Sequence, residues 1–396
     1  MIHLPYIFTG DKQIVAFYLS LKEIWRNKGR FFLFSLVIAL IAILVLFTNG
    51  LAFGLASANK EYLENINAQL LIFKEDVDYS TIESRIEYKH VKRIGRIDGV
   101  SEAGAIAFSN VKLVVDDHSA PIDVSFIGVQ PDKPGSPRIV AGYGLSSSTG
   151  KITVIDRSVA DSAGVNVGDD ITIKTNQGDD DKFYNLRVTG ITDSQQYFFR
   201  PSIFVKLPTW DRYRPRSDAG VYSNQPVVNV IAVLVEDLSI LGNLSTAISA
   251  IVDDVETTDI KTAYESAPGY SEQQGTLNTI QAFTFLIGTL VIGGFFQIQT
   301  LQKIPQIGML KAIGVPNRIV AGAAILQILL VTMFGVLIGA LATFGLVVGM
   351  PPNIPVVFSI NSVLNAIVSL LLIGPLGGMV SIRLALKVEP LTALGG

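Results

Sequence analysis

The chain has 396 residues, of which 49% are hydrophobic and only 16% are charged, and its mean hydropathy is +0.44. Soluble proteins carry about 25% charged residues, so this composition excludes an ordinary water-soluble protein. A net charge of −3 without a basic stripe excludes a nucleic-acid-binding protein, and the lack of cysteine excludes disulfides and thiolate metal sites.

The first predicted elements are a surface helix and a membrane span. Residues 1–30 form a cytoplasmic or interfacial segment, in which residues 12–30 are expected to be an amphipathic helix. Residues 31–59 carry no charge and are long enough to cross a bilayer core of about 30 Å. The apolar region of a signal peptide is only about 7–15 residues long, so we interpret this stretch as transmembrane helix 1. No proline or glycine follows Gly54 for the next ten residues, and the helix should therefore continue outward as a stalk.

Two groups of candidate functional residues lie on this first helix. Gly50, Gly54 and Ala58 recur every four residues, a spacing that permits close helix packing, either within the subunit or between two subunits. Glu61, Tyr62 and Glu64 stand where the helix should leave the bilayer. They are candidates for contact with a haem iron or a polar headgroup, although ordinary stalk residues would give the same pattern.

Residues 60–278 form the predicted extracytoplasmic domain. The stretch 60–272 holds 21 Lys and Arg against 31 Asp and Glu, a net charge of −10, which leaves +7 for the remainder. We expect an α+β domain in two lobes, with helices over 81–96 and 237–255 and strands over 110–115, 122–129, 151–155, 170–174, 184–191, 202–205 and 227–235. Asp156 is placed to cap a short helix over 157–163 that Gly164 ends.

Three further uncharged stretches, 281–302, 319–350 and 351–382, fill the last third of the chain and predict the membrane spans 279–302, 319–349 and 356–383. Their short basic loops, together with those around the first span, all fall on one side if both termini and the tail 384–396 are cytoplasmic. The sequence thus predicts an α-helical membrane protein of the bacterial plasma membrane, with four transmembrane helices in a 1+3 arrangement and a large extracytoplasmic α+β domain. The uncharged stretches contain no ionisable residue, so ion-driven transport is not expected, and the energy for transport must come from another source.

Residues 303–318, between the second and third spans, predict a short amphipathic helix at the cytoplasmic surface. Pro305 suits its first turn and Gly314 its end. An interfacial helix of this kind can offer an apolar ridge to a partner protein. The chain has no phosphate-binding loop of its own, and its three histidines are too dispersed for an obvious metal site.

The segment 302–318, Q-K-I-P-Q-I-G-M-L-K-A-I-G-V-P-N-R, resembles the cytoplasmic coupling helix of the MacB/FtsX-type ABC permeases, whose usual form is close to R-E-I-G-I-L-K-A-I-G-A. In this chain Gln306 replaces the family's usual Glu, and Pro305 replaces its usual basic residue. Residues 388–394 resemble the family's tail, and 151–174 resemble its outer-domain strand–helix–strand unit. Within the family, 18–30 and 50–59 look most like the HrtB-type haem exporters, and next the DevC-type permeases.

The resemblance implies a non-catalytic permease subunit that works as a homodimer with two copies of a separate ABC ATPase. ATP and Mg would be bound by that partner, and no cofactor by this chain. The expected ATPase contact is the ridge Ile304, Ile307, Leu310, Lys311 and Ile313. The expected activity is export or extraction of an amphipathic substrate, haem first, from the outer leaflet of the bilayer.

Three alternatives remain open from the sequence. The first is FtsX-like transmission of force to an extracytoplasmic partner protein. The second is DevC-like efflux of a glycolipid or drug with a membrane-fusion adaptor as partner. The third is a sensor that recruits a histidine kinase in peptide resistance, although such permeases commonly have ten spans and this chain has four.

Overall fold

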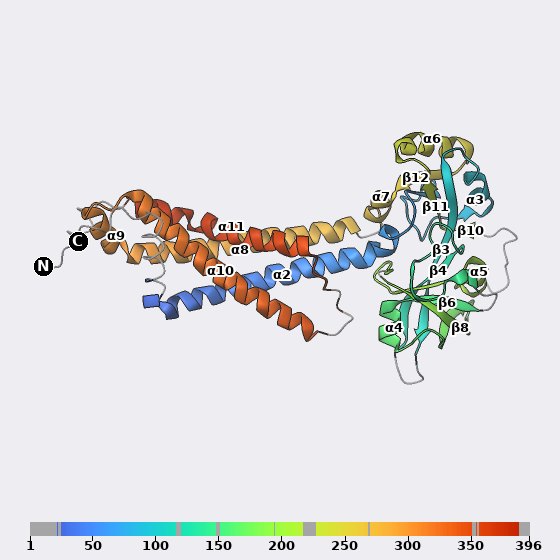
Figure 1. Cartoon of the computed structure of the whole chain (residues 1–396), viewed down its shortest axis with the longest axis horizontal. Helices are drawn as coiled ribbons and strands as arrows, with labels where there is room; N and C mark the ends of the chain where they lie inside the picture. Colours follow the sequence, from blue (N-terminus) through green and yellow to red (C-terminus); the bar gives the residue numbers. More distant parts are fainter. Residues whose placement is uncertain are drawn as a thin grey trace. The chain divides into compact units, whose positions relative to one another are not determined.

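The computed structural model describes residues 22, 25–115, 120–147, 151–193, 195–216, 227–267, 270–350, 354 and 356–387. The chain divides into two compact units, which we call the membrane unit (1–54 with 274–396) and the outer unit (55–273). Figure 1 shows the elements of both. Most of the expected surface helix over 12–30, and the tail from residue 388, lie outside the described residues.

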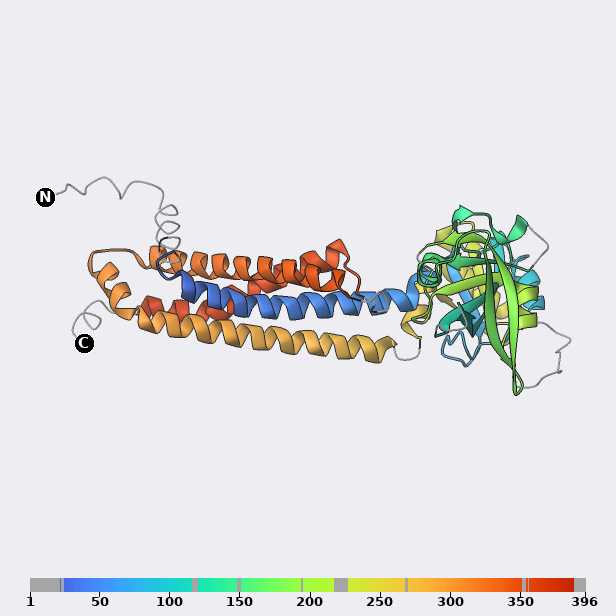
Figure 2. The same cartoon turned by 90° about the horizontal axis from the view of Figure 1, so that it is seen from below.

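Four helices among the described residues are long and apolar enough to cross a membrane: α2 (Lys28–Glu64), α8 (Tyr270–Gln302), α10 (Asn317–Val348) and α11 (Ile360–Lys387). The short helix α9 (Ile304–Ala312) connects α8 to α10 (Figure 2). This confirms the predicted 1+3 arrangement. The last span starts later than expected because residues 356–359 are not helical, and the Val357 N–H donates instead to the Gly50 carbonyl at 3.1 Å.

Glycines bring the membrane helices into backbone contact. A Cβ atom built on Gly335 of α10 would lie 2.7 Å from the Cβ of Ile38 in α2, and one on Gly339 would lie 2.6 Å from the Cβ of Ala42. Gly293 of α8 and Gly377 of α11 approach equally closely, with 2.7 Å from a built Cβ to the Gly377 carbonyl. In a bilayer, where apolar burial drives little helix association, such close packing supplies much of the attraction.

The outer unit contains twelve strands and five α-helices within the described residues. The strands are β1 (Leu70–Lys74), β2 (Ile86–Glu87), β3 (Val100–Val114), β4 (Ile122–Val129), β5 (Ile139–Gly142), β6 (Ile152–Asp156), β7 (Asp170–Gln177), β8 (Asp180–Thr192), β9 (Ser202–Lys206), β10 (Val227–Val228), β11 (Val230–Val235) and β12 (Val255–Asp259). The helices are α3 (Lys89–Ile94), α4 (Arg157–Ala163), α5 (Leu207–Tyr213), α6 (Leu241–Ile251) and α7 (Ile260–Glu265).

The sheet has two lobes that share β3. Strands β3, β4, β9, β6, β8 and β7 pair in a closed ring, and their buried side chains, Phe126, Ile155 and Ile173 among them, form one core. Strands β12, β1, β11 and β3 form the second lobe, in which Ile72 of β1 packs with Ile94 of α3 and Ile248 of α6. The predicted two-lobed α+β domain is therefore confirmed.

Local sequence signals in the first lobe are also confirmed. Asp156 caps α4 by accepting a hydrogen bond from the Ser158 N–H at 2.9 Å, and Gly164 ends the helix with φ of 66°. A left-handed conformation at this position costs glycine little, whereas a side chain would strain it. At the tip of the β7–β8 hairpin, Gly178 and Asp179 connect the paired residues Gln177 and Asp180.

The prediction of a helix over residues 81–96 is wrong. This segment forms β2 and then only the short helix α3. The buried Asn229 side chain explains the difference, since its Nδ2 donates to the carbonyls of Thr81 and Ser84 at 2.7 and 3.1 Å. Those carbonyls then no longer need helical partners. The helix expected over 237–255 is confirmed only as α6, preceded by a 3₁₀ turn (Leu238–Ile240) and followed by β12.

Candidate functional site

The helix α9 is fixed to the membrane unit along one face. Pro305 occupies its first turn, and Gly314, with φ of 91°, follows its end. Ile307 is buried with Val320 and Ala385, which come from α10 and α11. The Nζ of Lys311 donates to the Leu386 carbonyl at 2.7 Å. These contacts hold α9 against the ends of two membrane helices.

The opposite face of α9 is apolar and uncovered. Met309 is 57% exposed and Ile313, just after the helix, is 69% exposed. Residues four apart on a helix lie side by side, so these two form one continuous patch. Of the predicted ridge, Ile313 lies on this face, Ile304, Leu310 and Lys311 are half-buried, and Ile307 is buried.

Met309 is the residue that the sequence reasoning missed. The two apolar faces of a nine-residue helix look alike in the sequence, and only the packing of Ile307 shows which of them points inward.

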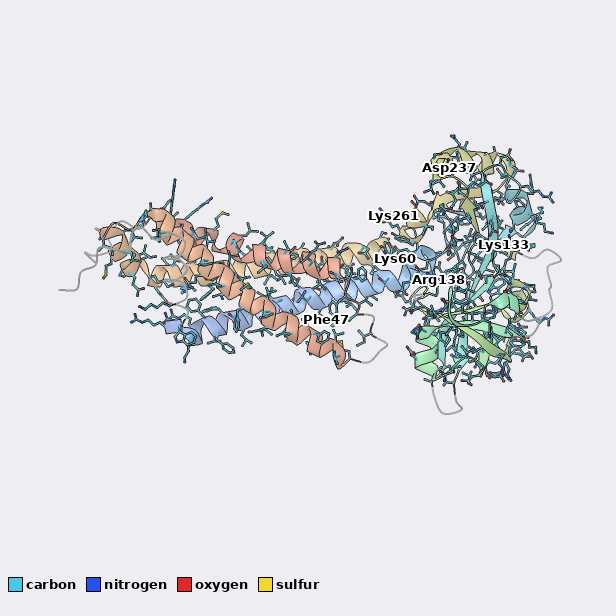
Figure 3. All side chains as sticks on the ribbon, in the orientation of Figure 1. Phe47, Lys60, Lys133, Arg138, Asp237 and Lys261 are labelled. Carbon is cyan, nitrogen blue, oxygen red and sulfur yellow. The ribbon has the colours of Figure 1, made fainter. Side chains whose placement is uncertain are left out.

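The candidate substrate residues at the end of α2 lie in the outer unit and all have partners there. The Tyr62 ring is 1% exposed, beside Phe204, and its hydroxyl donates to the Gly135 carbonyl at 2.8 Å. The half-buried Glu61 carboxylate accepts a hydrogen bond from the backbone of Gln196. Glu64 is exposed and pairs at 2.6 Å with Lys60, the residue labelled in Figure 3.

Tyr62 is thus placed as a core residue, and replacing it with Phe should mainly cost stability. The Gly135 carbonyl would lose its donor, which costs about 1–2 kcal/mol. Thermal unfolding of the full-length protein should then show a melting temperature lower by about 2–6 °C. Tyr143→Phe is the control, because the Tyr143 side chain is 73% exposed. Unchanged stability together with lost binding of a haem probe would instead mark Tyr62 as a ligand.

The small residues of α2 pack within the chain. A Cβ on Gly50 would lie 2.6 Å from the Phe358 ring and 3.0 Å from Val356. Gly54 and Ala58 are buried, and the Ala58 carbonyl accepts from the Phe199 N–H at 3.1 Å. A dimer contact through these three residues remains a prediction.

A second candidate site is a cavity of about 330 Å³ in the outer unit, which we call the outer cavity. Phe108, Tyr197, Phe198 and Trp210 supply aromatic walls, and Arg85 and Arg214 supply two guanidinium groups, of which that of Arg214 pairs with Asp211 at 3.0 Å. Burial and the neighbouring Arg214 lower the pKa of Arg85, whereas burial raises the pKa of Tyr197 to about 12. A guanidinium remains charged despite such a shift, so the outer cavity suits a ligand that is both aromatic and anionic. No sequence signal marked these residues, because they come from distant segments.

Among the residues that the structure describes, no three His, Asp or Glu side chains are grouped closely enough to hold an ion. His3 and His118 lie outside those residues.

Comparison with known proteins identifies both parts of the chain. Residues 31–259 match the family model of the MacB-like periplasmic core domain, and residues 278–390 match that of the FtsX-like permease C-terminal region. The first of these models alone spans more than half of the chain.

Two curated relatives match nearly end to end. A protein named putative hemin transport system permease protein HrtB from Staphylococcus haemolyticus is 28% identical over 378 residues, which is 96% of this chain and 99% of that protein. The protein of the same name from Staphylococcus epidermidis is 25% identical over 381 residues, with the same coverage. Among solved structures, the periplasmic region of MacB from Actinobacillus actinomycetemcomitans aligns with a TM-score of 0.36 at 13% identity, covering 52% of this chain and 94% of that one. The chain therefore belongs to the MacB/FtsX-type ABC transporter permeases and is a membrane protein with a large extracellular domain.

Proposed function

We propose that this permease works as a homodimer with a separate ABC ATPase that binds α9, and that it exports an amphipathic, anionic molecule of the haem class from the outer leaflet. The observation that carries the ATPase assignment is the apolar patch of Met309 and Ile313 on a helix whose other face is fixed to α10 and α11. Movement imposed on such a helix passes directly to the membrane helices. The chain itself is the non-catalytic subunit.

The proposed orientation has both termini in the cytoplasm. Arg30 donates to Gln302 at 2.7 Å, and Lys311 donates to Leu386, so the start of α2 and the ends of α8 and α11 lie beside α9. Basic residues therefore gather at this end of the membrane unit: Arg30, Lys303, Lys311, Arg318, Arg383 and Lys387. An excess of Lys and Arg beside short loops supports cytoplasmic placement of that end.

The proposed substrate class rests on the relatives named as hemin transport permeases and on the chemistry of the outer unit. A tetrapyrrole has a flat aromatic body and carboxylate arms. The outer cavity offers aromatic walls with Arg85 and Arg214. The exposed Glu64 lies outside this cavity, and its carboxylate would have to leave its pair with Lys60 to bind an iron. At about 330 Å³ the outer cavity takes one edge of such a molecule rather than the whole.

The test is the ATPase activity of the complex in lipid vesicles, titrated with haemin and, as a control, with an uncharged amphipathic drug. We expect haemin to raise the ATPase activity saturably, and we expect Glu64→Gln or Arg85→Gln to weaken this stimulation. Glu236→Gln removes an exposed carboxylate of the outer unit that does not line the outer cavity, and it should leave the response unchanged. A response to the uncharged drug equal to that with haemin would contradict the substrate class.

A second function, transmission of force to an extracellular partner protein, is favoured by one observation. Helix α2 runs unbroken from Lys28 to Glu64, and its last turn is buried in the core of the outer unit through Tyr62 and Leu63. Basal ATPase activity indifferent to every small molecule, but changed by an extracellular protein, would support this function instead.

A further inference from the structure

A polar cavity of about 450 Å³ lies inside the membrane unit, between α9 and the ends of α8, α10 and α11. We call it the α9 cavity. The side chains of Gln299, Lys303, Gln327 and Ser381 line it together with Ile307 and Leu310 of α9. It is a separate feature from the exposed patch of α9, which lies on the opposite face.

Two buried amide groups in the α9 cavity lack partners. Gln299 is 4% exposed and Gln327 is 6% exposed. Among the described residues, neither the Oε1 of Gln299 nor the Nε2 of Gln327 has a hydrogen-bond partner. A buried polar atom without a partner is costly, so a bound molecule that satisfied both atoms would gain that free energy on binding.

The charge around these amides is positive. Lys22, Arg26 and Lys303 line the α9 cavity, and the Nζ of Lys303 lies 3.4 Å from the Oε1 of Gln327. No Asp or Glu occurs among the lining residues that the structure describes. The α9 cavity therefore attracts an anion, and Gln327 offers that anion an N–H donor.

We propose that the α9 cavity binds the phosphoglycerol headgroup of an anionic membrane lipid. Its phosphate oxygens would accept hydrogen bonds from the Gln327 amide and the Lys303 ammonium, and a glycerol hydroxyl would donate to the Oε1 of Gln299. A choline headgroup has no hydroxyl or N–H to donate, and the ammonium of ethanolamine would meet three cations. The lining of the α9 cavity comes from the ends of α8, α10 and α11, where lipid headgroups lie.

Such a lipid would contact Leu310 and Ile307, and Ile307 is the side chain that packs α9 against α10 and α11. It would therefore stabilise the position of the helix proposed to receive the ATPase. This site goes beyond the proposed transport function. The lipid would belong to the cytoplasmic leaflet, and only this assignment rests on the proposed orientation.

The experiment is lipid retention by the purified full-length permease, measured by native mass spectrometry after mild delipidation. The protein is then offered phosphatidylglycerol, phosphatidylethanolamine or phosphatidylcholine in mixed micelles. We expect about tenfold preference for phosphatidylglycerol, the effect of one charge-assisted hydrogen bond. Lys303→Met and Gln327→Leu should each reduce that preference severalfold. Arg318→Gln is the matched control, because it removes an exposed charge near the same end without lining the α9 cavity.

A second measurement is the thermal stability of the permease in the presence of soluble glycerol 3-phosphate or inorganic phosphate. It distinguishes a lipid headgroup from a soluble phosphate ester as the ligand of the α9 cavity. Stabilisation by these anions, without retention of the lipid, would assign the α9 cavity to a soluble phosphate ester and reject a lipid. Equal retention of all three lipids, or an equal loss in Arg318→Gln, would overturn the proposal. Neither readout uses ATPase activity, so a wrong transport substrate would not affect the result.

Discussion

Replacing both Met309 and Ile313 with Asp should weaken binding of the ATPase by about 10²–10³-fold, because well-buried apolar anchors of an interface contribute about 1–2 kcal/mol each or more. Both side chains are more than half exposed in the permease alone, so the substitutions should not disturb its fold. Co-purification and the affinity of the ATPase for the permease in vesicles provide the measurement.

Asn317→Asp is the matched control. It adds a carboxylate at the same end of the membrane unit, in the exposed first turn of α10, where the helix dipole favours a negative charge. Normal ATPase binding by the Met309 and Ile313 variant would refute the coupling surface. Leu310→Asp is a poorer test, because the half-buried Leu310 lines the α9 cavity and its loss would also disturb packing.

The sequence predicts the membrane part of the fold well because a bilayer leaves few choices. Uncharged stretches of 20 or more residues must be helices, and Pro305 and Gly314 mark the ends of α9 directly. The sequence could not show which face of α9 packs against the membrane helices. That depends on the packing of Ile307 against Val320 and Ala385, and these residues come close to Ile307 only in the folded chain.

In the outer unit the errors have a common physical cause, which is that a distant side chain decides the local structure. Asn229 binds carbonyls 145 and 148 residues earlier in the chain and so prevents a helix there. Tyr62 looked like an exposed stalk residue, yet the core formed by Phe108, Tyr197 and Phe204 encloses it. By contrast, Asp156 and Gly164 act on their immediate neighbours, and their roles were predicted correctly.

Replacing Gly339 with Leu should prevent α2 and α10 from packing. A built Cβ at Gly339 already lies 2.6 Å from the Ala42 Cβ and 2.8 Å from the Ala39 carbonyl oxygen, and a backbone atom cannot rotate away as a side chain can. Overpacking of a tight interface costs about 1–3 kcal/mol, and a whole isobutyl group against backbone should reach or exceed the upper figure. We expect a large loss of monodisperse protein and of thermal stability.

Gly345→Leu provides the matched control on the same helix, since a Cβ there meets nothing within 4 Å. Loss of folded protein in both variants would mean that leucine harms α10 generally, and the close approach would then not be the cause. A milder pair tests the geometry itself. Gly339→Ala should destabilise the protein, and adding Ala42→Gly should restore part of the loss by removing the opposing methyl group. The rescue should be only partial, because the Ala39 carbonyl stays in place.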